Sequence, residues 1–249
     1  MNKSIYALTA VLTFLVFMII MTPASWVVSV VGEDLTDGIP DLQIGALNGS
    51  IWNGTGDMQY RDFPPLTVSW QLDALPLLMG TLSTAVQVEA DGLEASFQAL
   101  LSRSGGEIQN AVATIQSSYI NQVTVNYGLD LSGTFDLSQA STSFDQQWLT
   151  SLDGDINWPG GIVLIETPQQ INRVELPPLT GRLKLEEGII LLDVTSPNSD
   201  LIAIRIKPDG WAEVAISYAF MALANMPVPG AANGSFQVEP AVLLEEKIL

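Results

Sequence analysis

The sequence predicts a mainly β protein, with a single transmembrane helix at the amino terminus and then a domain of many short antiparallel strands and one or two short helices. Three observations predict this class. An uncharged apolar run opens the chain, apolar and polar residues alternate beyond residue 32, and short turn-forming pairs separate the alternating runs. A period of two is typical of strands with one face on a core and the other in water.

The first element is the apolar run, which has no charged residue between Lys3 and Glu33. A helix from about Ile5 to Val28 would be roughly 36 Å long at 1.5 Å per residue, which is enough to cross a bilayer. The competing interpretation is a cleaved signal peptide, whose apolar region would be shorter, at about 7–15 residues. The residues assigned to the membrane anchor are Ile5, Phe14, Phe17, Met21 and Trp26.

The charges that flank the anchor predict its orientation. Lys3 and the α-amino group precede it, whereas Glu33 and Asp34 follow it. Positive charge stays on the cytoplasmic side, so residues 1–32 are predicted to form a cytoplasmic stub and anchor. Residues 33–249 would then be a periplasmic domain of a single-pass inner-membrane protein. A polar stretch at 138–147 allows a division of this domain into halves at 34–138 and 148–249.

The strands and helices follow in order after the anchor. Alternation is clearest in residues 82–89, 93–101, 129–137, 182–186 and 202–207. Turn pairs such as Asp153-Gly154 and Glu187-Gly188 separate these runs. The two segments with helical character are 73–79 and 217–225.

Composition excludes several classes of function. The net charge is −18, from 27 acidic and 9 basic residues, so the chain lacks the basic footprint of a nucleic-acid binder. It contains no cysteine and no histidine, which excludes thiolate and imidazole metal sites and serine–histidine catalysis. No catalytic, metal-binding or cofactor-binding residue is therefore assigned, and no cofactor is expected.

Two patterns resemble functional sites but fit a structural role better. Asp153, Asp155 and Asn157 have the first spacings of a calcium loop, but Trp158 and Leu164 stand where that loop needs glycine and glutamate. This segment is predicted to be a solvated turn. The other pattern is the set of adjacent acidic pairs, whose side chains would point to opposite faces of a strand. Acidic residues that are far apart in the sequence could still meet in space as the catalytic pair of a hydrolase, and the sequence leaves this alternative open.

A short stretch near the start of the predicted domain carries a specific motif. Residues 47–54 contain Gly49, Ser50, Trp52 and Gly54, and they resemble the G-x-[ST]-x-W-x-G signature of the type II secretion system protein N family. Because residues 50–52 are too few for a strand between two hairpins, one of the two Asn-Gly pairs is predicted to be a bulge or a strand end. Later segments resemble the same family, through Trp70, Pro76, Gly80, Gly154, Trp158 and Gly161.

The resemblance implies a non-enzymatic inner-membrane component of the machinery that exports folded proteins from the periplasm. Its expected partners are the other inner-membrane components, namely protein C and the platform proteins, together with the lipid bilayer and without nucleic acid. Exposed strand edges are the expected docking sites. The alternative is an envelope lipid-handling protein with a β-groove, and a further rival is a periplasmic hydrolase.

Overall fold

The computed structural model describes residues 21–26, 41–61, 63–77, 79–166, 171–224 and 242–247. Within these ranges, thirteen antiparallel strands form one large sheet, so the predicted mainly β class is confirmed. The strands lie across this sheet in the same order as along the chain, except that β7, β10 and β11 are not part of it. Its strands are β1 (Leu42–Gly49), β2 (Asn53–Tyr60), β3 (Leu66–Asp73), β4 (Leu82–Ala90), β5 (Leu93–Ser102), β6 (Gly105–Gln116), β8 (Thr134–Asp145), β9 (Leu149–Trp158), β12 (Leu179–Glu186), β13 (Ile189–Ser196), β14 (Ser199–Ile206), β15 (Trp211–Ile216) and β16 (Val242–Lys247).

A second, smaller sheet and short helices complete the described structure. The small sheet contains β7 (Leu129–Leu131), β10 (Gly161–Glu166) and β11 (Ile171–Leu176), in the order β11-β10-β7. The helices are α3 (Ala74–Leu77), α4 (Ser117–Thr124), the 3-10 turn η1 (Val125–Tyr127) and α5 (Tyr218–Leu223). Helices α3 and α5 lie where helical character was predicted, whereas α4 was not predicted.

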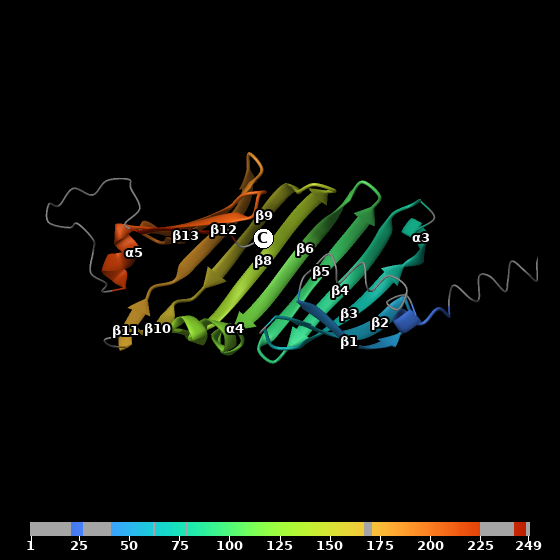
Figure 1. The fold of residues 1–249 in the computed structure, drawn as a ribbon, viewed down its shortest axis with the longest axis horizontal. Helices are drawn as coiled ribbons and strands as arrows, with labels where there is room; N and C mark the ends of the chain where they lie inside the picture. Colours follow the sequence, from blue (N-terminus) through green and yellow to red (C-terminus); the bar gives the residue numbers. More distant parts are fainter. Residues whose placement is uncertain are drawn as a thin grey trace, which may run out of the picture.

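The large sheet twists along its length. Figure 1 shows the central strands face-on and β12 and β13 almost edge-on, with β1 to β3 at one end and β10, β11 and α5 at the other. Residues 138–147, the polar stretch between the two suggested halves, lie mostly in β8, which pairs with β6 on one side and β9 on the other. The sheet is therefore continuous through this segment.

The small sheet arises because the chain leaves the large sheet twice. Alternation over residues 129–137 predicted a single strand, but the structure divides it at Gly133, which has a positive φ of 93°. Residues before Gly133 pair with β10, and those after it pair with β6. The β10–β11 hairpin leaves after Pro159-Gly160 and returns through Pro177-Pro178, residues that interrupt regular strand pairing.

The amino-terminal region is only partly described. Ile5, Phe14 and Phe17 of the predicted anchor lie outside the described residues, whereas Met21 and Trp26 are 60% and 61% exposed. None of the helices in the described ranges has the length and apolar character needed to cross a bilayer. The membrane span therefore stays a prediction.

Candidate functional site

One face of the large sheet is apolar from end to end. Directly paired residues of antiparallel strands share a face, so the register gives the side of each residue. Trp70 pairs with Val86, which in turn pairs with Phe97, and the same face continues to the last strands. We call it the apolar face, and its large side chains are Leu42, Ile44, Leu47, Met58, Tyr60, Leu66, Val68, Trp70, Leu72, Leu82, Val86, Val88, Leu93, Phe97, Leu101, Ile108, Ile115, Phe135, Leu137, Phe144, Leu149, Leu152, Ile156, Trp158, Leu179, Leu183, Leu185, Ile190, Leu192, Val194, Ile202, Ile204, Ile206, Val214, Ile216 and Leu244.

The few polar groups on the apolar face are paired inside the protein. Thr84 donates its hydroxyl to the Gln71 carbonyl at 3.1 Å, and Thr142 donates to the Ser151 carbonyl at 2.9 Å. No charged side chain lies on this face among the residues whose side chains are described. Apart from the Tyr60 hydroxyl, the face therefore offers a ligand almost no polar group and is suited to hydrocarbon.

The opposite face is polar and carries ion pairs. Arg182 reaches Asp153 at 2.6 Å and Asp155 at 2.7 Å, and the hydrogen bond that Arg182 donates to Asp155 raises the pKa of Arg182. The calcium-like segment thus lies within β9, so the predicted solvated turn is wrong at this position. Alternate residues of a strand share a face, which explains why both aspartates meet the same guanidinium. The described residues contain no group of acids that could hold a metal ion.

Lys184 makes a second cluster on the polar face. Its ammonium lies 2.9 Å from Glu186 and 3.2 Å from Asp193. Hydrogen bonds to Glu186 and then Asp193 raise the pKa of Lys184. The sheet is therefore amphipathic, with its described charges on the polar face and its apolar side chains concentrated on the other.

A cavity lies where the small sheet and α5 cover part of the apolar face. Its volume is about 510 Å³, and each of its fourteen lining residues is apolar. In Figure 1 the cavity region is at the end of the molecule where α5, β10 and β11 gather beside β12 and β13. The lining residues are Leu129, Leu131, Phe135, Trp158, Val163, Ile165, Val174, Leu176, Leu179, Ile202, Ile216, Phe220, Met221 and Ala224.

The wall of this cavity is the best-packed part of the described molecule. Trp158 is 4% exposed and stacks on Phe135, with ring centroids 5.8 Å apart. Its indole N–H donates to the Ser132 carbonyl at 2.8 Å. Val163 and Val174 approach from the small sheet and are also buried. Two layers of the same chain therefore form the walls of the cavity.

The two helices at this end hold the covering layer in place. Ser217 caps α5: its hydroxyl accepts from the Phe220 N–H at 3.2 Å and donates to the Asp200 carbonyl at 2.7 Å. On α4, the Asn121 amide accepts from the Leu131 N–H at 2.9 Å and donates to the Leu131 carbonyl at 2.8 Å. The Asn121 amide thus pairs with both the N–H and the C=O of Leu131, as a residue of a neighbouring strand would.

The first two motif segments from the sequence meet at the other end of the sheet. Gly49 ends β1 with a positive φ of 86°, which confirms the predicted strand end at this Asn-Gly pair. Ser50 accepts hydrogen bonds from the Trp52 and Asn53 N–H groups, both at 3.2 Å. These bonds shape the turn between β1 and β2.

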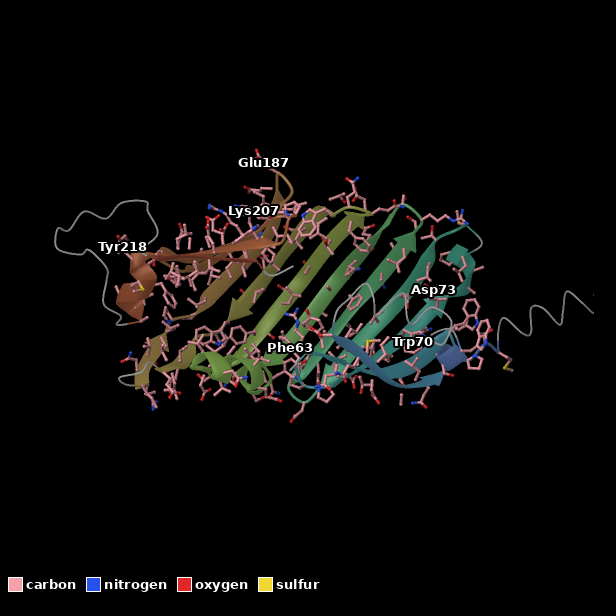
Figure 2. All side chains as sticks on the ribbon, in the orientation of Figure 1. Phe63, Trp70, Asp73, Glu187, Lys207 and Tyr218 are labelled. Carbon is pink, nitrogen blue, oxygen red and sulfur yellow. The ribbon has the colours of Figure 1, made fainter. Side chains whose placement is uncertain are left out.

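Trp70 is the residue that joins this turn to β3. A Cβ placed on Gly54 would lie 2.5 Å from the Trp70 ring, so the ring needs glycine at that position. The Trp70 indole N–H donates to the Ile51 carbonyl at 3.1 Å. Figure 2 labels Trp70 at this end of the molecule and Tyr218 on α5 at the opposite end.

The other motif residues lie in two further places. Pro76 and Gly80 shape the turn after α3, where the Pro76 carbonyl accepts from Met79 and Thr81 N–H groups. Gly154 faces Ala140 in the large sheet, and Gly161 lies beside Ser132 and Trp158 next to the cavity. The ten motif residues therefore stabilise separate turns and close contacts, and they do not form a single site.

Sequence reasoning missed the covering layer of the cavity. Val163 and Ile165 alternate along β10, and Val174 and Leu176 do so along β11. This alternation is a signal for strands, but it does not reveal that the hairpin folds over the apolar face. The cavity was therefore outside what the sequence predicted.

Comparison with known proteins gives one family. A sequence model of the type II secretion system (T2SS) protein N family matches residues 40–227. The matched range runs from just before β1 to just beyond α5, so it includes the motif turn and the cavity walls. Neither the curated proteins nor the solved structures give a match.

Proposed function

We propose a function for this chain on the premise that it belongs to the type II secretion system protein N family. The chain is a component of type II secretion, and family membership implies association with other components of that system. The observation that carries this proposal is the match over residues 40–227, which takes in nearly all of the described fold. The amphipathic sheet supports a binding or assembly role rather than catalysis.

The finer proposal concerns its placement in the envelope. Residues 1–32 tether the protein to the inner membrane, and residues 33–249 form a non-enzymatic periplasmic domain. The uncharged run after Lys3 supports the tether, and the acidic residues at 33 and 34 support the orientation. The partners are protein C and the platform proteins, which share this compartment boundary.

The free edge at β1 is the proposed docking site. In the part of the chain that the structure describes, β1 and β16 are the outermost strands of the large sheet. Natural sheets protect edge strands with charge or proline, yet β1 has neither, whereas β16 carries two glutamates and a lysine. The β1 edge therefore offers backbone donors and acceptors to a partner strand.

The position of β1 also favours contact with a membrane-tethered partner. Residues 21–26 lie beside the β1–β2 turn, where Pro23 forms a bridge with Ser50 and the Ile51 N–H donates to the Thr22 carbonyl at 3.2 Å. These residues belong to the carboxyl-terminal part of the predicted anchor. A partner emerging from the same membrane would meet this edge first.

Photo-cross-linking in native membranes tests this proposal. A photoreactive residue at Gln43 on β1 is expected to capture protein C or a platform protein. Gln98 is the matched control because it is also an exposed glutamine but lies on β5, inside the sheet. Equal capture at both positions, or none from Gln43, would contradict docking at this edge.

Amide hydrogen exchange then tests the pairing itself. Adding the periplasmic domain of protein C is expected to slow exchange along residues 42–49 and to leave the central strand β9 unchanged. Protection of β16 alone would move the docking site to the other edge. Unchanged exchange at both edges would exclude strand pairing.

A further inference from the structure

We propose that the cavity between the apolar face and the small sheet binds the acyl chains of a zwitterionic phospholipid. The inference goes beyond the proposed secretion role and does not depend on it. It rests on the size and lining of the cavity, on the pairing of the backbone around it, and on the charge of the whole chain.

The size and chemistry of the cavity fit hydrocarbon. Its volume of about 510 Å³ lies within the range of roughly 300–1,000 Å³ that is typical of small-molecule sites. Such sites usually combine apolar walls with a few polar groups that orient the ligand, but here all fourteen lining residues are apolar. A ligand that fills this space must therefore be apolar along its inserted length.

A peptide fits this space poorly. An extended peptide carries one N–H and one C=O group per residue, and each needs a partner once it leaves water. The walls present side chains from sheet faces, and the backbone groups of β10 are already paired with β11 on one side and β7 on the other. An acyl chain has no polar group to satisfy.

The cavity opens onto a larger surface of the same chemistry. Phe135, Trp158 and Leu179 belong both to the cavity wall and to the apolar face. That face continues across the thirteen strands of the large sheet, a width of roughly 58 Å at about 4.8 Å per strand spacing. A lipid chain longer than the cavity would thus continue onto a surface on which none of the described side chains is charged.

The charge of the chain selects the headgroup class. With a net charge of −18, the protein repels anionic headgroups, whereas a zwitterionic headgroup carries no net charge. Phosphatidylethanolamine is the zwitterionic lipid that we choose as the reference ligand for the test.

Photo-cross-linking of the full chain in its native membrane tests the site directly. A photoreactive residue replaces Phe220, which lines the cavity, in cells whose lipids are labelled with carbon-14 acetate and phosphorus-32 phosphate. The matched control replaces Tyr218 on the same helix, which lines a depression shared with Arg205 and Asp200 instead. Figure 2 labels Tyr218, the first residue of α5.

The expected result is an adduct at position 220 that carries both labels and has the mass of phosphatidylethanolamine, with at least five-fold less at position 218. A protein adduct at position 220 would overturn the lipid assignment in favour of a peptide. Equal labelling at both positions, or labelling with an anionic lipid, would also overturn the proposal. If position 43 still captures protein C or a platform protein while position 220 gives no lipid adduct, the lipid site is contradicted and the proposed secretion role is not.

A pair of cavity-filling variants provides the second measurement. Val163 and Val174 are register partners that both face the cavity, so V163F with V174F is expected to reduce the adduct at position 220 at least five-fold. Ile162 and Glu175 are the neighbouring partners on the other face of the same hairpin. I162F with E175F is therefore the control and is expected to leave the adduct unchanged. Circular dichroism establishes that both variants are folded, and equal adduct in both would contradict the site.

Discussion

The two ends of the large sheet have the same sequence pattern but different surroundings. From β1 to β6, most of the large side chains of the apolar face are half-buried, Leu101 is 39% exposed, and none of the described cavity-lining residues belongs to these strands. From β8 to β15 the small sheet and α5 lie over part of the same face. There Trp158 is 4% exposed and Ala224 is fully buried.

This difference teaches that alternation determines which face is apolar but not whether that face is covered. The cover comes from chain segments that leave the sheet, namely β7, the β10–β11 hairpin and α5. Where these segments fold back over the apolar face, they also line the cavity. In the part of the chain that the structure describes, one end is thus a packed two-layer structure, and the other is an amphipathic single layer.

Two of the three motif tryptophans, Trp70 and Trp158, lie at opposite ends of the sheet. Trp158 and Trp70 each donate the indole N–H to a backbone carbonyl, that of Ser132 and that of Ile51. Trp158 also stacks on Phe135 inside the two-layer end, whereas Trp70 lies half-buried over Gly54. We therefore expect a substitution at Trp158 to lower the free energy of unfolding more than a substitution at the contact between Trp70 and Gly54.

The largest expected effect is that of Trp158→Ala. It removes the stack on Phe135 and a hydrogen bond from a buried site, so the free energy of unfolding should fall by about 3–5 kcal/mol. Urea unfolding followed by circular dichroism measures the loss. Trp211→Ala is the control, because Trp211 is 44% exposed and should change stability by less than about 0.5 kcal/mol. Similar losses for both would mean that the two-layer end is not the stable part.

Gly54→Ala tests the single-layer end and should cost less. The new Cβ would lie 2.5 Å from the Trp70 ring and 2.6 Å from the Asn48 carbonyl oxygen, and overpacking of this kind costs about 1–3 kcal/mol. Thr55→Val on the exposed side of the same strand is the control. Adding Trp70→Leu to Gly54→Ala should recover part of the loss, because it relieves one of the two contacts. Strict additivity of the two substitutions would contradict the packing of Trp70 on Gly54.

Much of the large sheet follows from its sequence. The strands at 82–90, 93–102, 179–186 and 199–206 all lie within or around predicted runs, since half-buried strands impose a period of two. The helix α5 was also predicted. These elements depend on local pattern, and that pattern is fully present in the sequence.

The covering layer did not follow from the sequence for a physical reason. Residues 129–137 alternate without interruption, yet Gly133 turns the chain so that the run is divided between two sheets. Helix α4 is held by the contacts of Asn121 with Leu131 in β7, ten residues further along the chain, and an alternating or helical pattern does not report such contacts. The cavity depends on this placement, so it was beyond sequence reasoning, whereas the motif turn around Gly49 was within it.

A smaller effect is expected for the charges of the polar face. Arg182→Gln removes both ion pairs to Asp153 and Asp155, but Arg182 is half-exposed and ion pairs between exposed side chains contribute little to stability. The loss should shrink at high salt, because exposed charges are screened. Urea unfolding at low and high salt measures it, with Arg205→Gln, which loses a longer contact to Glu213, as the control. A loss as large as that of Trp158→Ala would mean that the polar face, and not the covering layer, distinguishes the two ends.

The smallest effect concerns Asp145, which ends β8 where the uncovered part of the sheet gives way to the covered part. Its carboxylate accepts from the Trp148 N–H at 2.9 Å and the Gln147 N–H at 2.7 Å, and these bonds lower the pKa of Asp145 below its usual value of 3.8. A lowered pKa in the folded state means that the stabilisation is complete above the unfolded pKa and is lost as the pH falls through the folded one. Asp145→Asn keeps an acceptor oxygen but cannot titrate, so its unfolding midpoint should depend less on pH than that of the wild type between about pH 2 and 4. The two proteins should differ little in that dependence at neutral pH, and an identical acid dependence would contradict a lowered pKa of Asp145 in the folded state.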